Sequence, residues 1–216
     1  MKTQDIYKYI DHTQLQPTST WEDIEKLCIE SIRFSTASAC IPPSYVKRAH
    51  GIFGNRVNIC TVIGFPLGYS KTSVKLFEAE QALADGASEI DMVINIGDLK
   101  NKDFTKIYEE IHTLKKAVCN NTLKVIVETC YLAEEEKVEM CKIVTDAGAD
   151  YIKTSTGFGT AGATLEDVLL FKRHIGSNVK IKAAGGIKTK EDLELFIESG
   201  CSRIGSSSAV KILGGQ

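Results

Sequence analysis

The chain has 216 residues, of which 43% are hydrophobic and 25% are charged, and its formal net charge is −2 at pH 7. This length accommodates one sizeable domain, and the small net charge gives no bulk attraction for nucleic acid or for an anionic membrane. The amino terminus has no apolar signal core, and no apolar run approaches the length of a membrane span. We therefore expect neither nucleic acid nor a membrane as a partner.

Short apolar runs with the residue preferences of strands alternate with longer amphipathic runs along the whole chain. We predict eight strands, at residues 9–13, 34–40, 57–64, 89–95, 123–129, 151–155, 179–184 and 203–206. This order implies parallel strands with right-handed crossovers, and eight such strands close a (β/α)8 TIM barrel. A doubly wound open sheet is the alternative, but no Gly-x-Gly-x-x-Gly turn follows the first strand.

Helical patterns fill the intervals between most of these strands. We predict helices at residues 21–32, 73–84, 104–118, 133–147, 165–175 and 191–198. No linker, low-complexity tract or block of charge interrupts the alternation. We therefore expect one α/β barrel domain over residues 1–216.

The cysteines and histidines bear on the compartment and on metal binding. The seven cysteines form no Cys-x-x-Cys pair and several lie in apolar runs, which is typical of a reducing compartment, so we expect a cytoplasmic protein. The four histidines have no metal-ligand spacing, so we expect no metal. Cys40 ends the second predicted strand and is a candidate for lining the site.

A weak internal repeat relates three predicted strands. Residues 85–91, 147–153 and 199–205 align without gaps, each with a glycine, an isoleucine four places later and a variable residue after it. That variable residue is Asp91, Lys153 or Gly205. Strand alternation turns the isoleucine towards the helices and its successor into the barrel, so an acid, an amine and a bare backbone are expected at equivalent inward positions.

A second lysine has a similar setting on the seventh predicted strand. Lys182 lies nearer the carboxyl end of that strand, where barrel sites are built, than Lys180 does. Two ammonium groups in one poorly hydrated cavity lower the pKa of at least one, and a neutral amine is a nucleophile. A single strand lysine is more often solvated, which is our interpretation of Lys180, but Lys153 and Lys182 together favour catalysis.

Acidic residues accompany the two lysines. Asp91 lies in an apolar run, where an ionised carboxylate needs a partner, and inward lysines would supply one and allow proton relay. A structural role as the cap of a loop amide suits Glu89 better. Asp11 and Glu128 lie near strand ends, where they support the site or serve the fold alone.

Two glycine-rich turns indicate a phosphate site. Gly185 and Gly186 follow the seventh predicted strand, whereas Gly205, Ser206 and Ser207 end the eighth. Barrels commonly hold phosphate with backbone N–H groups at these two turns. The hydroxyl of Thr156, which follows the sixth strand, is expected at the rim of the same pocket.

With these residues in place, the chain resembles the deoxyribose-phosphate aldolases over essentially its full length. The resemblance rests on residues 11–13, 64–68, 89–95, 152–158, 185–187 and 203–207, which occur in the order of that family. The lysine motif followed by the second lysine and Gly-Gly is the most specific part. The glycine turns alone are not specific.

The resemblance implies a metal-free class I aldolase with no cofactor. Its substrate would be a small phosphorylated sugar, 2-deoxy-D-ribose 5-phosphate, split reversibly into D-glyceraldehyde 3-phosphate and acetaldehyde in deoxyribonucleotide catabolism. Lys153 would form the Schiff base, Lys182 would depress the pKa of that amine, and Asp91 would relay protons. Gly185, Gly186, Gly205, Ser206 and Ser207 would hold the phosphate.

Some features of the chain depart from the family pattern or leave alternatives open. Ala183 and Lys188 replace a proline and an arginine found in many members, and the chain ends in Gly-Gly-Gln where part of the family has a tyrosine. Proton transfer at the enamine carbon is therefore expected to use another group or water. An aldolase for another phosphorylated aldehyde and a non-catalytic phosphate-binding barrel are the alternatives. A homodimer is a possible assembly.

Overall fold

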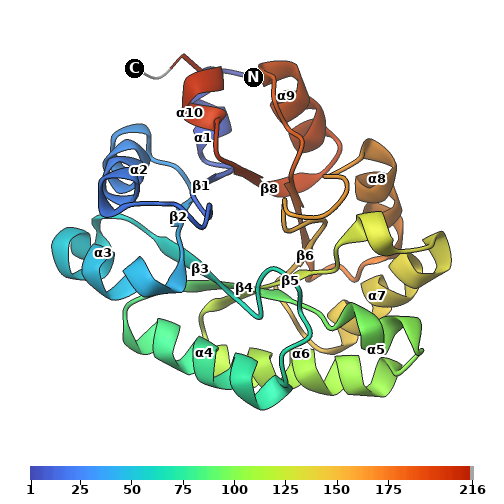
Figure 1. The fold of residues 1–216 in the computed structure, drawn as a ribbon. Helices are drawn as coiled ribbons and strands as arrows, with labels where there is room; N and C mark the ends of the chain where they lie inside the picture. Colours follow the sequence, from blue (N-terminus) through green and yellow to red (C-terminus); the bar gives the residue numbers. More distant parts are fainter. Residues whose placement is uncertain (215–216) are drawn as a thin grey trace.

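The computed structural model describes residues 1–214, so Gly215 and Gln216 lie outside the described residues. Eight parallel strands close a barrel in the order β1 to β8, and β8 pairs with β1. The helices form a ring around the strands (Figure 1). The predicted (β/α)8 barrel is confirmed.

All eight predicted strands are present, but most are shorter than expected. They are β1 (Ile10–Thr13), β2 (Ser38–Cys40), β3 (Ile59–Ile63), β4 (Glu89–Val93), β5 (Thr122–Ile126), β6 (Tyr151–Lys153), β7 (Lys180–Ala184) and β8 (Cys201–Ser206). The largest error is at β2. Phe34 still belongs to the preceding helix, and Ser35 closes that helix in the left-handed region with φ of 55°, so the strand begins only at Ser38.

The six predicted helices are also present. The α-helices are α1 (Thr3–Tyr7), α2 (Trp21–Phe34), α3 (Val46–Phe53), α4 (Thr72–Ala84), α5 (Ile96–Lys100), α6 (Phe104–Val118), α7 (Glu134–Asp146), α8 (Leu165–His174), α9 (Lys190–Glu198) and α10 (Ala209–Ile212). The sequence analysis missed α3 and the short α1, α5 and α10. The buried residues Val46, Ala49 and Phe53 have helical spacing, so the signal for α3 was present.

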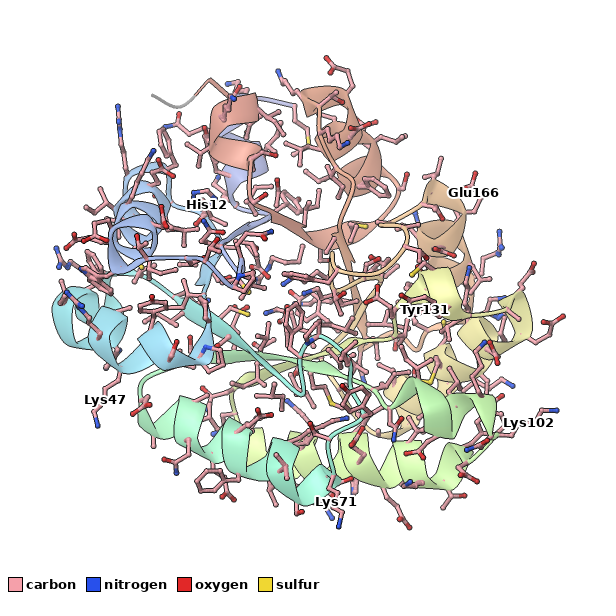
Figure 2. The ribbon with its side chains drawn as sticks, in the orientation of Figure 1. His12, Lys47, Lys71, Lys102, Tyr131 and Glu166 are labelled. Atoms are coloured by element: carbon pink, nitrogen blue, oxygen red, sulfur yellow. The ribbon has the colours of Figure 1, made fainter. Side chains whose placement is uncertain are left out.

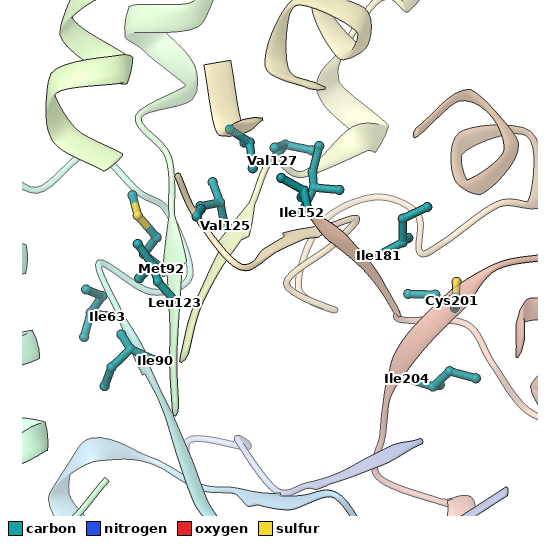
Figure 3. Packing of buried hydrophobic residues seen from close by; sticks show 14 of the residues in the cluster. Ile63, Ile90, Met92, Leu123, Val125, Val127, Ile152, Ile181, Cys201 and Ile204 are labelled. Atoms are coloured by element: carbon teal, nitrogen blue, oxygen red, sulfur yellow. The ribbon is translucent and has the colours of Figure 1, made fainter. Parts of the chain in front are cut away.

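Strand alternation separates an apolar outer layer from a charged interior. Ile90, Ile152 and Ile204 are fully buried in the main hydrophobic core, which Figure 3 shows at close range. Burial of each such side chain contributes about 1.5–3 kcal/mol relative to exposure. Their successors Asp91 and Lys153 face each other inside the barrel, which confirms the orientation predicted from the repeat.

The outer surface carries the solvated charges. Lys47, Lys71 and Lys102 project from the outer edge of the molecule, far from the strands (Figure 2). Lys180, at the start of β7, is exposed as expected. No helix within residues 1–214 is long and apolar enough to cross a membrane.

One buried ion pair lies between the helices rather than inside the barrel. Lys75 on α4 contacts Glu110 on α6 at 2.9 Å and donates a hydrogen bond to the Val93 carbonyl oxygen at 2.8 Å. Burial lowers the pKa of Lys75 and raises that of Glu110, in both cases against the attraction of the partner. The pair ties two neighbouring helices to the carboxyl end of β4.

We predict that Lys75→Met lowers the free energy of unfolding by about 3–5 kcal/mol, because it leaves the Glu110 carboxylate buried without its cation. Chemical denaturation measures the effect. The control is Lys8→Met, which removes an exposed ion pair with Asp5 and should change stability little. Equal stability of the two variants would contradict the assignment.

Candidate active site

A cavity of about 420 Å³ opens at the carboxyl ends of the strands. Its walls are residues 13–16 at the end of β1, 156–158 after β6, 184–187 at the end of β7 and 205–208 at the end of β8, and Lys153 also lines it. The volume suits a small molecule. The carboxyl face is also where barrel enzymes place their sites.

Lys153 connects this cavity to the charged interior of the barrel. Its side chain is 4% exposed, and its Nζ lies 2.7 Å from Oδ2 of Asp91. The backbones of Lys153 and Lys182 are direct partners on β6 and β7. The two lysines therefore lie side by side, as the sequence analysis predicted.

Lys182 is held as a cation deeper in the barrel. It is fully buried, contacts Asp91 Oδ2 at 2.7 Å and donates a short hydrogen bond to Asp11. Burial alone would lower the pKa of Lys182, but the carboxylates of Asp11 and Asp91 outweigh burial and raise it above the ordinary value. Lys182 is therefore a permanent positive charge beside Lys153.

Asp91 is the centre of the interior charges. Its Oδ2 contacts Lys153 and Lys182, while Oδ1 accepts a hydrogen bond from Lys124 at 2.8 Å and one from the Cys60 thiol at 3.2 Å. Burial alone would raise the pKa of Asp91, but the three ammonium groups hold it well below its usual value. The predicted pairing of Asp91 with inward lysines is confirmed.

Three charged residues of the interior had no such role in the sequence analysis. Lys124 on β5 lies 2.5 Å from Glu89, and Arg203 on β8 lies 2.9 Å from Glu89. The expectation that Glu89 caps a loop amide is therefore wrong, because its carboxylate turns into the barrel and meets two cations. The available signal was the period-two alternation that sets Glu89 on the same side of β4 as Asp91.

Asp11 supports the site from β1. Its carboxylate accepts hydrogen bonds from Ser38 at 2.6 Å and from Arg203 at 2.5 Å, besides the bond from Lys182. Burial alone would raise the pKa of Asp11, but Lys182, Lys124 and Arg203 lower it. Asp11 therefore fixes the Lys182 ammonium in place.

The two glycine-rich turns form one wall of the cavity. Gly185 and Gly186 adopt φ of 82° and 77°, which a side chain rarely tolerates. A Cβ at Gly162, in the β6–α8 loop, would lie 2.3 Å from the Gly185 backbone, so the two loops pack without room for a side chain. Gly205, Ser206 and Ser207 complete this wall.

The buried carboxylate of Glu128 fixes the position of Thr156. Glu128 lies just after β5 with a left-handed φ of 55°, and its two carboxylate oxygens accept the Thr156 N–H at 3.2 and 3.3 Å. The Thr156 hydroxyl also donates a short bond to Glu128. Glu128 therefore orients the loop that carries Thr156 and Gly157 into the cavity.

Cys40 is not among the residues that line the cavity. It packs in a small apolar cluster with Cys60 and Val62 on β3. A hydrogen bond from Cys60 lowers the pKa of the Cys40 thiol against the effect of burial. Cys40 is therefore buried beside Cys60, and the expected contact with the cavity is not found among the described lining residues.

The barrel interior contains donor groups that also occur at metal sites. Ligand atoms of Cys60, Asp11 and Glu89 lie within 4.8 Å of one another. Lys124 Nζ lies among them, 2.5 Å from Glu89, 3.2 Å from the Cys60 sulfur and 3.6 Å from Asp11. An ammonium group thus already neutralises this donor set. The expectation of a metal-free reaction stays a prediction.

The chain has relatives both among known sequences and among solved structures. A family model described as DeoC/LacD family aldolase matches residues 6–210. Deoxyribose-phosphate aldolase of Clostridium botulinum (strain Eklund 17B / Type B) is 64% identical over 216 residues, which is 100% of this chain and 98% of the relative. The enzyme of that name in Clostridioides difficile (strain 630) is 60% identical, over 96% of this chain and 95% of the relative.

Similar solved structures are also those of aldolases. The aldolase QR15 matches with a TM-score of 0.93 and 42% identity, over 97% of this chain and 94% of its own. A tetrameric deoxyribose phosphate aldolase from Aeropyrum pernix matches with a TM-score of 0.91 and 32% identity, over 98% of this chain and 90% of its own. With similarity over nearly its whole length, this chain belongs to the DeoC/LacD family of aldolases.

Proposed function

We propose that this enzyme cleaves 2-deoxy-D-ribose 5-phosphate reversibly to D-glyceraldehyde 3-phosphate and acetaldehyde, through a Schiff base on Lys153, in deoxyribonucleotide catabolism. The observation that carries the proposal is the position of Lys153. Its amine lines a cavity of about 420 Å³, one wall of which is made of glycine and serine turns. The names of the close relatives support the choice of substrate.

The first half of the reaction forms the imine. The unprotonated Lys153 amine attacks C1 of the open-chain aldehyde to give a carbinolamine, which takes up one proton and loses water to give a protonated imine. The Lys182 ammonium, two hydrogen bonds away through Asp91, disfavours a second positive charge nearby. The geometry therefore places a fixed positive charge beside the proposed nucleophile.

The second half breaks the carbon–carbon bond. A base takes the proton of the C3 hydroxyl, and the electron pair of the C2–C3 bond moves into the iminium group. This step releases D-glyceraldehyde 3-phosphate and leaves an enamine on Lys153. Protonation of the enamine carbon and addition of water then release acetaldehyde and restore the amine.

Asp91 is our candidate for proton transfer in these steps. Its Oδ2 lies 2.7 Å from the amine of Lys153 and 2.7 Å from that of Lys182. This carboxylate oxygen can therefore pass protons to and from the Lys153 side of the site, while the Lys182 ammonium holds it in place. The interior cations keep Asp91 ionised between transfers.

The phosphate would lie against the two glycine-rich turns of the cavity. Gly185, Gly186 and Gly205 leave backbone N–H groups accessible, and Ser206 and Ser207 add hydroxyl groups. Among the described residues that line the cavity, Lys153 is the one with a cationic side chain. Neutral donors therefore hold the anion, and the position of the phosphate sets C1 beside the amine.

We predict that borohydride reduction in the presence of acetaldehyde attaches an ethyl group to Lys153, because the amine forms an imine that hydride reduces irreversibly. Peptide mass mapping measures the site of attachment. Lys153→Met should remove the adduct. Lys180→Met, which changes the exposed lysine at the start of the neighbouring strand β7, should retain the adduct. An adduct at another lysine refutes the assignment, and no adduct at all favours a non-catalytic phosphate-binding barrel.

We predict that Gly186→Ala raises the KM for 2-deoxy-D-ribose 5-phosphate at least about tenfold, which corresponds to roughly 1.4 kcal/mol of lost binding. The left-handed φ of 77° at Gly186 opposes a side chain and turns the N–H away from the phosphate. Steady-state kinetics with the phosphorylated and unphosphorylated sugars measure the effect, which should be confined to the former.

The matched control for the phosphate wall is Gly148→Ala. Gly148 has φ of 78° and open space around its α-carbon, as Gly186 largely does, but it lies in the turn before β6, outside the cavity. Gly148→Ala should therefore lower stability without changing KM. An equal rise in KM in both variants would show that general strain, and not lost phosphate binding, is responsible.

We also propose a homodimer that acts in the cytoplasm. All seven cysteines are free, which suits a reducing compartment. Val74 and Phe77 are exposed on one face of α4, Phe77 by 62%, and offer apolar surface to a second copy. Light scattering should give twice the mass of the chain, and Phe77→Glu should reduce it to that of a monomer. A monomeric wild-type protein would refute this assembly.

A further inference from the structure

The barrel interior holds a network of ion pairs, and the part of it around Arg203 and Glu89 is not used directly by the proposed reaction. Arg203 on β8 lies 2.5 Å from Asp11 on β1 and 2.9 Å from Glu89 on β4. Its side chain is 13% exposed, and its guanidinium also lies 5.5 Å from the ring of Tyr151. Arg203 and Glu89 do not line the cavity.

Two chains of contacts connect this network to the nucleophilic amine. One leads from Glu89 to Lys124 at 2.5 Å, from Lys124 to Asp91 at 2.8 Å, and from Asp91 to Lys153 at 2.7 Å. The other leads from Arg203 through Asp11 and Lys182 to the same Asp91 oxygen. Both chains are nearly dry, so water screens their charges little.

The charges in this network do not balance. Within residues 1–214, its cations are Lys124, Lys153, Lys182 and Arg203, and its carboxylates are Asp11, Glu89 and Asp91. Full protonation of the four basic groups therefore leaves one unpaired positive charge in a buried space. Loss of one proton restores neutrality.

The contacts indicate which group gives up that proton. Arginine stays charged in proteins, and Lys124 and Lys182 each contact at least two carboxylates. In the described part of the chain, Lys153 makes an ion pair with Asp91 alone, and it is the network cation that borders the cavity. The charge imbalance therefore acts on the amine that reacts.

Other titratable groups around Lys153 add little to this balance. Burial raises the pKa of the Cys60 thiol, so Cys60 stays neutral. Within residues 1–214, Glu128 accepts hydrogen bonds from Thr156 and makes no ion pair with the four network cations, and His12 faces outward to Glu30 at 2.7 Å. Cys40 is the group that needs a control, because its thiol pKa is lowered.

We propose that Arg203 and Glu89 are positioning residues that set, from the far end of the barrel, the pH at which Lys153 becomes reactive. Arg203 contributes the positive charge that makes the interior cationic, and Glu89 limits the excess to one charge. The proposal rests on the Schiff-base role of Lys153. A purely structural role, in which the two residues only join β8, β1 and β4, predicts slower reaction without a change in pH dependence.

The test is the rate of reductive trapping of acetaldehyde on Lys153 as a function of pH. Arg203→Gln should move the midpoint of the profile upward by about one pH unit, because removal of a buried positive charge favours the protonated amine. Glu89→Gln should move it downward by a similar amount. Opposite shifts from the two members of one ion pair are the signature of the proposal.

Four controls separate charge from packing. Arg203→Lys keeps the charge, and the double variant Arg203→Met with Glu89→Met keeps the balance, so both should retain the wild-type midpoint. Lys180→Gln removes a solvated cation near the same Tyr151 ring and should also leave the midpoint unchanged. The opposite shifts should persist when Cys40→Ser is added.

The outcomes distinguish this proposal from the proposed function. If wild-type protein is not trapped at Lys153, the function fails before any variant is measured. If wild-type trapping succeeds but Arg203→Gln and Glu89→Gln shift the midpoint in the same direction, or not at all, the proposal for these two residues is wrong. Circular dichroism reports folding, and should Arg203→Gln fail to fold, the sign of the shift in Glu89→Gln decides the question.

Discussion

The cost of placing charge inside a barrel governs this structure. Lys124, Lys182, Asp11 and Asp91 are fully buried, and an isolated ion in such a place would be strongly destabilising. Each is tolerated because it contacts groups of opposite sign from other strands. The positions of the strands and the electrostatics of the site are therefore two results of the same set of contacts.

The parallel register brings these charges together in pairs. Asp91 and Lys124 are direct partners on β4 and β5, and Lys153 and Lys182 are direct partners on β6 and β7. Closure of β8 onto β1 then brings Arg203 within reach of Asp11. A shift of one residue in any of these strands would turn its charged side chain from the interior into the hydrophobic layer under the helices.

The sequence was informative where the signal was local and periodic. The repeat glycine-x-x-x-isoleucine placed Asp91 and Lys153 inside the barrel. Lys180 and Lys182 share one face of β7, and the position of Lys182 nearer the carboxyl end distinguished it from exposed Lys180. Lys124 and Arg203 were missed because their roles depend on partners 33 to 192 residues away, which only closure of the barrel reveals. Glu89 was misjudged although its alternation with Asp91 placed it on the inward face of β4. The start of β2 was misplaced because Ser35 ends α2 in a conformation that propensity does not reveal.

Close packing of two backbone segments beside the cavity limits which of its walls can be altered to fit a different substrate. Ala163 donates its N–H to both the Ala184 and Gly185 carbonyl oxygens, and Gly162 lies against Gly185 with no space for a side chain. The loops after β6 and β7 therefore behave as one stiff wall. Residues 14–16, which line the cavity after β1, have no such close contact with any described glycine. Variation in substrate size is thus easier to accommodate through the loop after β1 than through the wall that carries the glycines.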